Sequence, residues 1–144
     1  MTDTPARPLT VDLLGYTIHL DTSLLRESDS EVRRQVREYD RGEREAFDLA
    51  VEYPGTFSGR VWERVACLSH GETVTYGELA AELGTAPIAV GGANARNPLP
   101  LVVPCHRVVG TDSLRGYRYP GLKERLLRHE GSAGSLAFDL DGTV

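Results

Sequence analysis

Three prolines close together constrain this chain more than any other feature of its sequence. Pro98, Pro100 and Pro104 all lie in the segment 97–104. Each proline fixes φ and lacks a backbone N–H, so this segment is not expected to be helical and is expected to be held extended. It leads directly into Cys105. The sequence therefore predicts a stiff segment that delivers a cysteine to a fixed position.

Apolar residues at helical spacing occur on both sides of this segment. Two of these stretches begin with a capping signature, because Ser28 and Thr75 are each followed three residues later by a glutamate, Glu31 and Glu78. Several stretches end at a glycine, as is common where a helix terminates in a left-handed residue. The predicted helices cover residues 28–41, 57–68, 75–83, 88–96 and 122–130.

Alternating apolar and polar residues predict strands over 16–20 and 47–53. With the first helix between these strands, residues 1–54 are expected to form a small α/β unit. Residues 55–131 are expected to form a mainly helical domain, followed by a loosely held tail over 132–144. The fold class is therefore predicted to be α+β. The short turn between the third and fourth predicted helices outlines a helix-turn-helix.

Charge is distributed unevenly along the chain. The formal net charge is -5, from 16 basic and 21 acidic residues, which argues against a protein that coats nucleic acid through its overall charge. Residues 85–131, however, carry seven basic residues against three acidic ones. This part of the chain is where a polyanion is expected to bind.

The cysteine content and the absence of a long apolar stretch bear on compartment and cofactors. Cys67 and Cys105 occur without a signal peptide or a membrane-spanning segment, which predicts reduced thiols and a cytoplasmic protein without membrane contact. Cys67 and the histidines are not spaced to hold zinc. We therefore expect no metal and no cofactor.

Cys105 is the candidate nucleophile. Only a thiolate is strongly nucleophilic, so a neighbouring base must take the thiol proton, and His106 is the obvious candidate. Adjacent side chains of an extended chain point to opposite faces, so we expect a water molecule to link the two. Glu130 shares a buried helical face with Leu126 and Leu127, and a carboxylate there needs a partner such as the imidazole of His106.

Spacing alone leaves two interpretations open. The three residues could form a catalytic cysteine–histidine–glutamate trio, or Cys105 could be a structural cysteine beside a hydrogen-bonded histidine. A thiol hydrolase built on the same trio would also need an oxyanion hole, which we cannot locate in the sequence. A helix-turn-helix regulator is disfavoured by the net charge and by the scarcity of base-reading side chains in the fourth predicted helix.

The run over residues 97–109, Asn-Pro-Leu-Pro-Leu-Val-Val-Pro-Cys-His-Arg-Val-Val, resembles the active-site signature of the O6-alkylguanine-DNA alkyltransferases. The similarity extends over residues 43–131. It includes Phe57, Val61–Trp62, the run from Gly71 to Ala80, the run from Ala89 to Asn94, and Gly116–Tyr117.

The resemblance implies irreversible DNA repair, in which an alkyl group on guanine O6 moves to the cysteine of a monomeric protein bound to double-stranded DNA. It also implies a shortened ribonuclease-H-like amino-terminal unit and a winged-helix-like helix-turn-helix. The sequence leaves open the range of lesions, O4-alkylthymine included.

On the family pattern, five residues have catalytic roles. Cys105 is the acceptor, His106 the water-linked base and Glu130 its partner. Asn97 braces the active-site turn, and Tyr76 donates a hydrogen bond to the leaving guanine.

The resemblance places the remaining site residues in contact with DNA or with a base turned out of the helix. A helix rich in small residues is expected to enter the minor groove, and a later loop is expected to form one wall of the base pocket. The residues assigned to these contacts are Ile88, Ala89, Gly91, Gly92, Asn94, Arg96, Arg107, Val108, Tyr117 and Arg118.

The chain departs from the family pattern at Ile88, where most members carry an intercalating arginine. An apolar wedge can also unstack a base step, so we expect Ile88 to take this role. Some relatives bind lesions without repairing them, but these lack the cysteine that is present here as Cys105.

Overall fold

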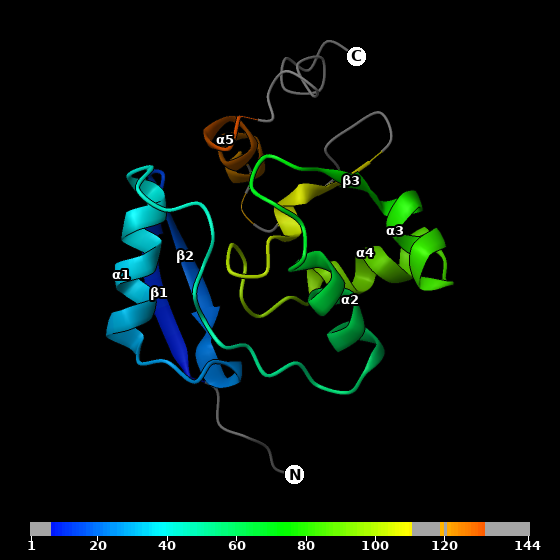
Figure 1. The fold of residues 1–144 in the computed structure, drawn as a ribbon, viewed down its shortest axis with the longest axis horizontal. Helices are drawn as coiled ribbons and strands as arrows, with labels where there is room; N and C mark the ends of the chain where they lie inside the picture. The colour runs from blue at the N-terminus through cyan, green and yellow to red at the C-terminus, as the bar shows by residue number, and fades with distance from the viewer. Residues whose placement is uncertain (1–6, 111–118, 120, 132–144) are drawn as a thin grey trace.

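The computed structural model describes residues 7–110, 119 and 121–131 and combines helices with short strands, in agreement with the predicted α+β class (Figure 1). No helix in these ranges is long and apolar enough to cross a bilayer. In chain order the elements are β1 (Pro8–Leu13), β2 (Tyr16–Asp21), the 3-10 turn η1 (Thr22–Leu24), α1 (Asp29–Asp40), α2 (Phe57–Val65), β3 (Val74–Thr75), α3 (Tyr76–Leu83), α4 (Pro87–Ala95), the 3-10 turn η2 (Cys105–Arg107), β4 (Val108–Val109) and α5 (Leu122–His129).

Strands β1 and β2 form an antiparallel hairpin that α1 covers (Figure 1). The two residues between the strands, Leu14 and Gly15, both have positive φ, the combination that a tight two-residue hairpin turn requires. Sequence patterning predicted β2 but missed β1, although its apolar residues alternate in the same way. We refer to residues 7–54 as the amino-terminal unit.

The predicted strand over 47–53 is wrong. Its alternating side chains are half-buried as the pattern indicated, but its backbone joins no sheet and forms only a single bridge, between Val51 and Leu25. Side chains and loops of the amino-terminal unit bind this backbone instead: the Glu27 carboxylate accepts from the Ala50 N–H at 3.0 Å. Period-two burial therefore identified an extended segment correctly but not its hydrogen-bonding partners.

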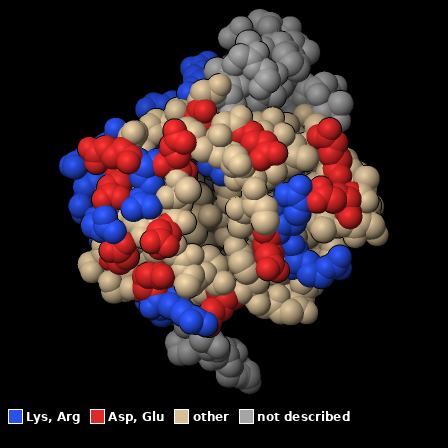
Figure 2. Space-filling model, viewed as in Figure 1, with Lys and Arg blue, Asp and Glu red and all other residues tan. Residues whose placement is uncertain are grey.

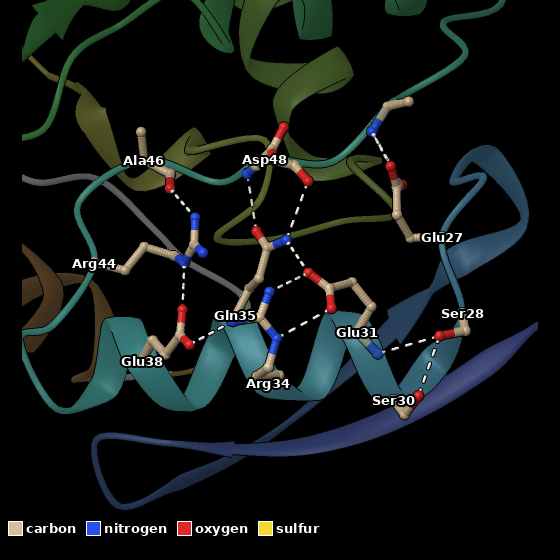
Figure 3. Close-up of polar contacts among 11 residues, drawn as sticks. Glu27, Ser28, Ser30, Glu31, Arg34, Gln35, Glu38, Arg44, Ala46 and Asp48 are labelled. Carbon is tan, nitrogen blue, oxygen red and sulfur yellow. Dashed lines mark hydrogen bonds and ion pairs between the residues drawn. The ribbon is translucent and has the colours of Figure 1, made fainter.

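The side chain of Gln35 in α1 binds both backbone polar groups of Asp48 in the extended segment, as a neighbouring strand would (Figure 3). Its side-chain amide donates to the Asp48 carbonyl at 3.0 Å, and its oxygen accepts from the Asp48 N–H at 2.8 Å. The same amide donates to Glu31, which also pairs with Arg34 on the exposed side of α1. A buried glutamine thus binds the extended segment to α1 through both of its polar atoms.

Helices α2, α3 and α4 pack together on the opposite side of the molecule (Figure 1). The predicted capping box of α3 is confirmed, with reciprocal hydrogen bonds between Thr75 and Glu78. Helix α2 ends three residues earlier than predicted, because the chain tightens into turns after Val65. The Trp62 indole donates to the Ala93 carbonyl at 2.8 Å and so fixes α2 against α4.

A short parallel pair joins two distant parts of the chain. Val74 pairs with Val108 and Thr75 pairs with Val109, so β3 is held beside β4. Because Tyr76 follows β3 and η2 precedes β4, this pair fixes the start of α3 close to the cysteine-bearing turn. Two residues are too few to show a sequence period, and neither strand was predicted.

One contiguous apolar core connects the amino-terminal unit with the later helices. The surface shown in Figure 2 intersperses acidic and basic side chains around a largely uncharged, hollowed centre. A cavity of about 550 Å³ lies between residues 45–53, 66–70 and 101–107. Its lining includes Pro104 and Arg107 but not Cys105.

We predict that replacing Gln35 with Leu lowers the free energy of unfolding by about 1–3 kcal/mol, because two hydrogen bonds to the Asp48 backbone are lost. Urea denaturation at pH 7 measures this change. The matched control is Arg34→Ala, which removes two exposed ion pairs of the same helix, to Glu31 and Glu38, and is expected to cost less. Equal losses in the two variants would contradict the role assigned to Gln35.

Candidate active site around Cys105

The segment 97–104 is non-helical, as predicted, but it folds into a turn instead of running straight. Asn97 holds this turn at two points: its amide donates to the Val103 carbonyl at 2.8 Å and its oxygen accepts from the Leu99 N–H at 2.9 Å. Leu101 has a φ of 82°, a left-handed conformation that few non-glycine residues adopt. The turn is therefore a strained structure held by a fully buried amide side chain.

Cys105 begins the η2 turn and is almost entirely buried, with 5% of its surface exposed. Its carbonyl accepts a hydrogen bond from the Asn94 side chain of α4 at 3.1 Å. Asn94 is itself buried, and its side-chain oxygen has no hydrogen-bond partner. The cysteine backbone is thus fixed from α4 on one side and from the Asn97 turn on the other.

His106 and Glu130 meet in the interior, where both side chains are inaccessible to solvent. The Nε2 of His106 lies 2.9 Å from Oε2 of Glu130. A carboxylate only accepts hydrogen bonds, so Nε2 carries the proton and Nδ1 carries the lone pair. The buried Nδ1 has no hydrogen-bond partner.

Burial also determines the protonation state of this histidine. Desolvation lowers the pKa of His106 below its usual value, and it outweighs the opposing effect of the Glu130 carboxylate. The imidazole is therefore neutral near pH 7. A neutral imidazole with an unengaged lone pair at Nδ1 can accept a proton, which is what a base for Cys105 requires.

Glu130 has a stronger partner than His106, and sequence reasoning missed it. The Arg107 guanidinium binds both carboxylate oxygens, with Nε 2.9 Å from Oε1 and Nη2 2.8 Å from Oε2. Burial would raise the pKa of Glu130, but hydrogen bonds from His106 and Arg107 outweigh it and hold the pKa below its usual range. The Tyr39 hydroxyl of α1 also donates to Oε2, at 2.6 Å.

This placement corrects the prediction that Arg107 contacts DNA. Its side chain is 7% exposed, and its remaining guanidinium nitrogen donates to the Leu68 carbonyl at 2.7 Å. A buried carboxylate needs a full positive charge nearby, which a neutral imidazole cannot supply, and that requirement could have identified Arg107 from the sequence. Lys123 is buried as well, so two of the basic residues counted in 85–131 are unavailable to a polyanion.

Tyr76 is the first residue of α3, and the pairing of β3 with β4 sets its position. Its ring lies near the backbone of Gly91 in α4. The Lys123 ammonium lies 5.7 Å from the centre of the ring and donates to the Val108 carbonyl at 2.7 Å. Tyr76 is therefore half-buried between α4 and α5, beside the turn that carries the cysteine.

The remaining predicted contact residues differ in how far they are exposed. Ile88, in the first turn of α4, is the large apolar side chain that the described part of the chain leaves most open, with 86% of its surface exposed. Arg96 is exposed and donates to Ser58, whereas Val108 is fully buried in β4, which argues against a side-chain contact with DNA. Ala89, Gly91 and Gly92 are partly buried on α4, and Tyr117 and Arg118 lie outside the described residues.

Metal binding finds no support in this geometry. Within residues 7–110, 119 and 121–131, no three His, Cys, Asp or Glu side chains gather in a way that could hold an ion. The groups around Cys105 are a base, a carboxylate, a guanidinium and a phenol, which suit proton transfer to and from a nucleophilic sulfur.

Comparisons with known proteins agree with this site. Residues 56–132 match the family model of the 6-O-methylguanine DNA methyltransferase, DNA binding domain. The methylated-DNA--protein-cysteine methyltransferase of Archaeoglobus fulgidus is 42% identical over 114 residues, which span 72% of this chain and 76% of the relative. The corresponding protein of Methanosarcina acetivorans is 45% identical over 107 residues, covering 71% and 69%.

A solved structure is similar over most of the chain. The structure of Mycobacterium tuberculosis OGT in complex with DNA superposes with a TM-score of 0.75 at 31% identity, and the match covers 85% of this chain and 91% of that one. This chain belongs to the 6-O-methylguanine-DNA methyltransferase family.

We predict that Arg107→Met lowers the free energy of unfolding by about 3–5 kcal/mol at pH 7, because it leaves the Glu130 charge buried without its cation. Chemical denaturation measures the loss. The loss should become smaller as the pH falls far enough to protonate Glu130 in the variant. A variant of unchanged stability but weakened DNA affinity would instead support the original assignment of Arg107 to DNA.

Proposed function

We propose that this protein repairs alkylated DNA directly, by moving the alkyl group from O6 of guanine in double-stranded DNA to the sulfur of Cys105. Each chain acts once, because the thioether that forms is stable. The observation that carries the proposal is the buried cysteine beside an imidazole whose Nε2 is held by Glu130 and whose Nδ1 is unengaged, in a member of this family.

The reaction balances without a cofactor. The Cys105 thiol loses its proton through a water molecule to Nδ1 of His106, and the thiolate attacks the alkyl carbon. The S–C bond forms as the C–O6 bond breaks, and the bonding electrons stay on the guanine. The guanine then gains a proton, so the proton that the thiol lost is matched by the one that the base receives.

Tyr76 assists the departure of guanine by donating a hydrogen bond to the ring. Its position between Gly91 and the Lys123 ammonium supports this role. The Lys123 ammonium beside the ring also brings positive charge close to a leaving group that becomes negative. Asn97 keeps the cysteine turn in place throughout.

Helices α3 and α4 act as a winged-helix-like helix-turn-helix, and α4 enters the minor groove. The small residues of α4 support this role because they allow its backbone to approach DNA closely. Ile88 inserts where the alkylated base has turned out of the stack, and its near-complete exposure supports a wedge function. Arg96 adds positive charge at the end of the same helix.

The remaining assignments follow the family pattern. The chain divides into a shortened ribonuclease-H-like unit over 1–54, an alkyltransferase domain over 55–131 and a tail over 132–144, and it acts as a monomer. The hairpin and α1 support the first assignment. Tyr117 and Arg118 contribute to the wall of the base pocket.

We predict that incubation with duplex DNA containing O6-methylguanine adds one methyl group, and no more, to each chain. Intact-mass spectrometry followed by peptide mapping should place the adduct on Cys105. Cys105→Ser should form no adduct, whereas Cys67→Ser, which removes the exposed cysteine, should react like the wild type. Release of many product molecules per chain would indicate a thiol hydrolase instead.

We predict that Tyr76→Phe slows single-turnover transfer by about 10²-fold or more, the usual contribution of a proton donor.

Ile88→Ala is expected to slow transfer from duplex DNA roughly tenfold, because unstacking becomes less favourable, and to leave reaction with free O6-benzylguanine unchanged. Quenched-flow measurement of both substrates separates the two effects. If Ile88→Ala leaves the duplex rate unchanged while Tyr76→Phe slows it, Ile88 is not a wedge.

A further inference from the structure

Tyr39 links the amino-terminal unit to the chemistry of a site 91 residues away in sequence. Its hydroxyl donates to Oε2 of Glu130 at 2.6 Å, the shortest of the hydrogen bonds given to this carboxylate. The residue is fully buried. The Tyr39 hydroxyl donates to Glu130 and not to the sulfur or its base, so its effect on the reaction is argued through Glu130.

The oxygen that Tyr39 binds is the one that holds the base. Oε2 accepts from the Tyr39 hydroxyl, from Nε2 of His106 at 2.9 Å and from Nη2 of Arg107 at 2.8 Å. Three donors therefore share the negative charge of one oxygen. The share taken by the phenol is not available to strengthen the hydrogen bond to the imidazole.

The surroundings keep this phenol in place and protonated. Its ring stacks on Phe47 at 5.7 Å and lies 5.0 Å from the ring of His129, whose Nε2 binds the Tyr39 carbonyl at 2.8 Å. Burial, reinforced by the Glu130 charge, raises the pKa of Tyr39 far above its usual value. The hydroxyl thus remains a donor at neutral pH.

We propose that Tyr39 is a positioning residue of the transfer reaction, through which the amino-terminal unit sets how strongly Glu130 polarises His106. This inference rests on the proposed function, because it assumes that His106 is the base for Cys105. It assigns the amino-terminal unit a chemical contribution besides its part in the apolar core.

The charged groups around His106 determine the expected direction. Glu130 makes its imidazole more basic, whereas Arg107 and Lys123 make it less so. Removing the Tyr39 hydroxyl leaves more negative charge on Oε2 for Nε2–H and therefore raises the proton affinity of Nδ1. His70 is a further titratable group beside the phenol, with its ring 6.2 Å from that of Tyr39.

The test is the pH profile of single-turnover transfer from O6-methylguanine duplex DNA by Tyr39→Phe. An imidazole that is already protonated cannot take the thiol proton, so the acid limb of the profile reports His106. We expect its midpoint to rise by roughly 0.5–1 pH unit, while the rate well above the midpoint does not fall. A lower rate at every pH with an unmoved midpoint would show that Tyr39 only packs.

Two control variants separate the hydroxyl from the ring and from the contact between units. Phe47→Leu disturbs the ring stacking and keeps the hydroxyl. Tyr119→Phe removes another phenol contact to the amino-terminal unit, the exposed hydrogen bond from the His19 N–H to the Tyr119 oxygen at 2.9 Å. Neither variant should move the midpoint.

A direct titration keeps this inference distinct from the proposed function. Nitrogen-15 NMR of histidine-labelled protein follows the His106 ring, with His106→Gln identifying its signal, and needs no DNA. We expect the titration midpoint of His106 to rise in Tyr39→Phe by the same interval. An unmoved midpoint overturns the inference even if the wild type transfers alkyl groups. A moved midpoint in a protein that forms no adduct upholds the link from Tyr39 through Glu130 to His106 and overturns the proposed function, and with it the role in transfer.

Discussion

The buried carboxylate of Glu130 is the group on which the rest of this structure depends. An isolated anion in the interior would cost several kcal/mol, so every neighbour must help to satisfy it. Arg107 supplies the compensating charge, and His106 and Tyr39 supply further donors to the same group. These donors come from α1 and η2, whereas Glu130 itself caps α5. One carboxylate therefore fixes the relative positions of three elements that are far apart in sequence.

In this arrangement one residue balances the charge of Glu130 and another accepts the thiol proton, whereas in a cysteine–histidine–glutamate trio alone the histidine would have to do both. If His106 alone balanced Glu130, the imidazole would have to be a cation and could not accept a proton. Because Arg107 neutralises the carboxylate, the imidazole can remain neutral in a fully buried position. Asn94 and Asn97 hold the backbone around the cysteine in place. The Asn94 side chain donates to the Cys105 carbonyl, and the Asn97 side chain donates to the Val103 carbonyl. The site is thus organised before any substrate arrives.

Local signals in the sequence were sufficient for much of the fold and for part of the site. Capping residues located α1 and α3, and the spacing of Glu130 from Leu126 and Leu127 correctly indicated a buried carboxylate that pairs with His106. The predictions that failed are those about which groups a segment or side chain binds. The extended segment 47–53 was mistaken for a strand because burial alternates regardless of what its backbone binds. Arg107 was assigned to DNA from the family resemblance, which does not reveal that its guanidinium is buried against Glu130, and Tyr39 was missed because nothing local links it to Glu130.

The separation of these groups along the chain has a consequence for biosynthesis. Glu130 is translated 24 residues after His106, and Tyr39 is translated 91 residues before Glu130. A nascent chain that has exposed its cysteine to the cell but still holds α5 inside the ribosome has no carboxylate to orient the imidazole. Its sulfur then has the modest reactivity of an ordinary thiol. The catalytic groups are therefore complete only after the chain has been synthesised as far as Glu130 and has folded.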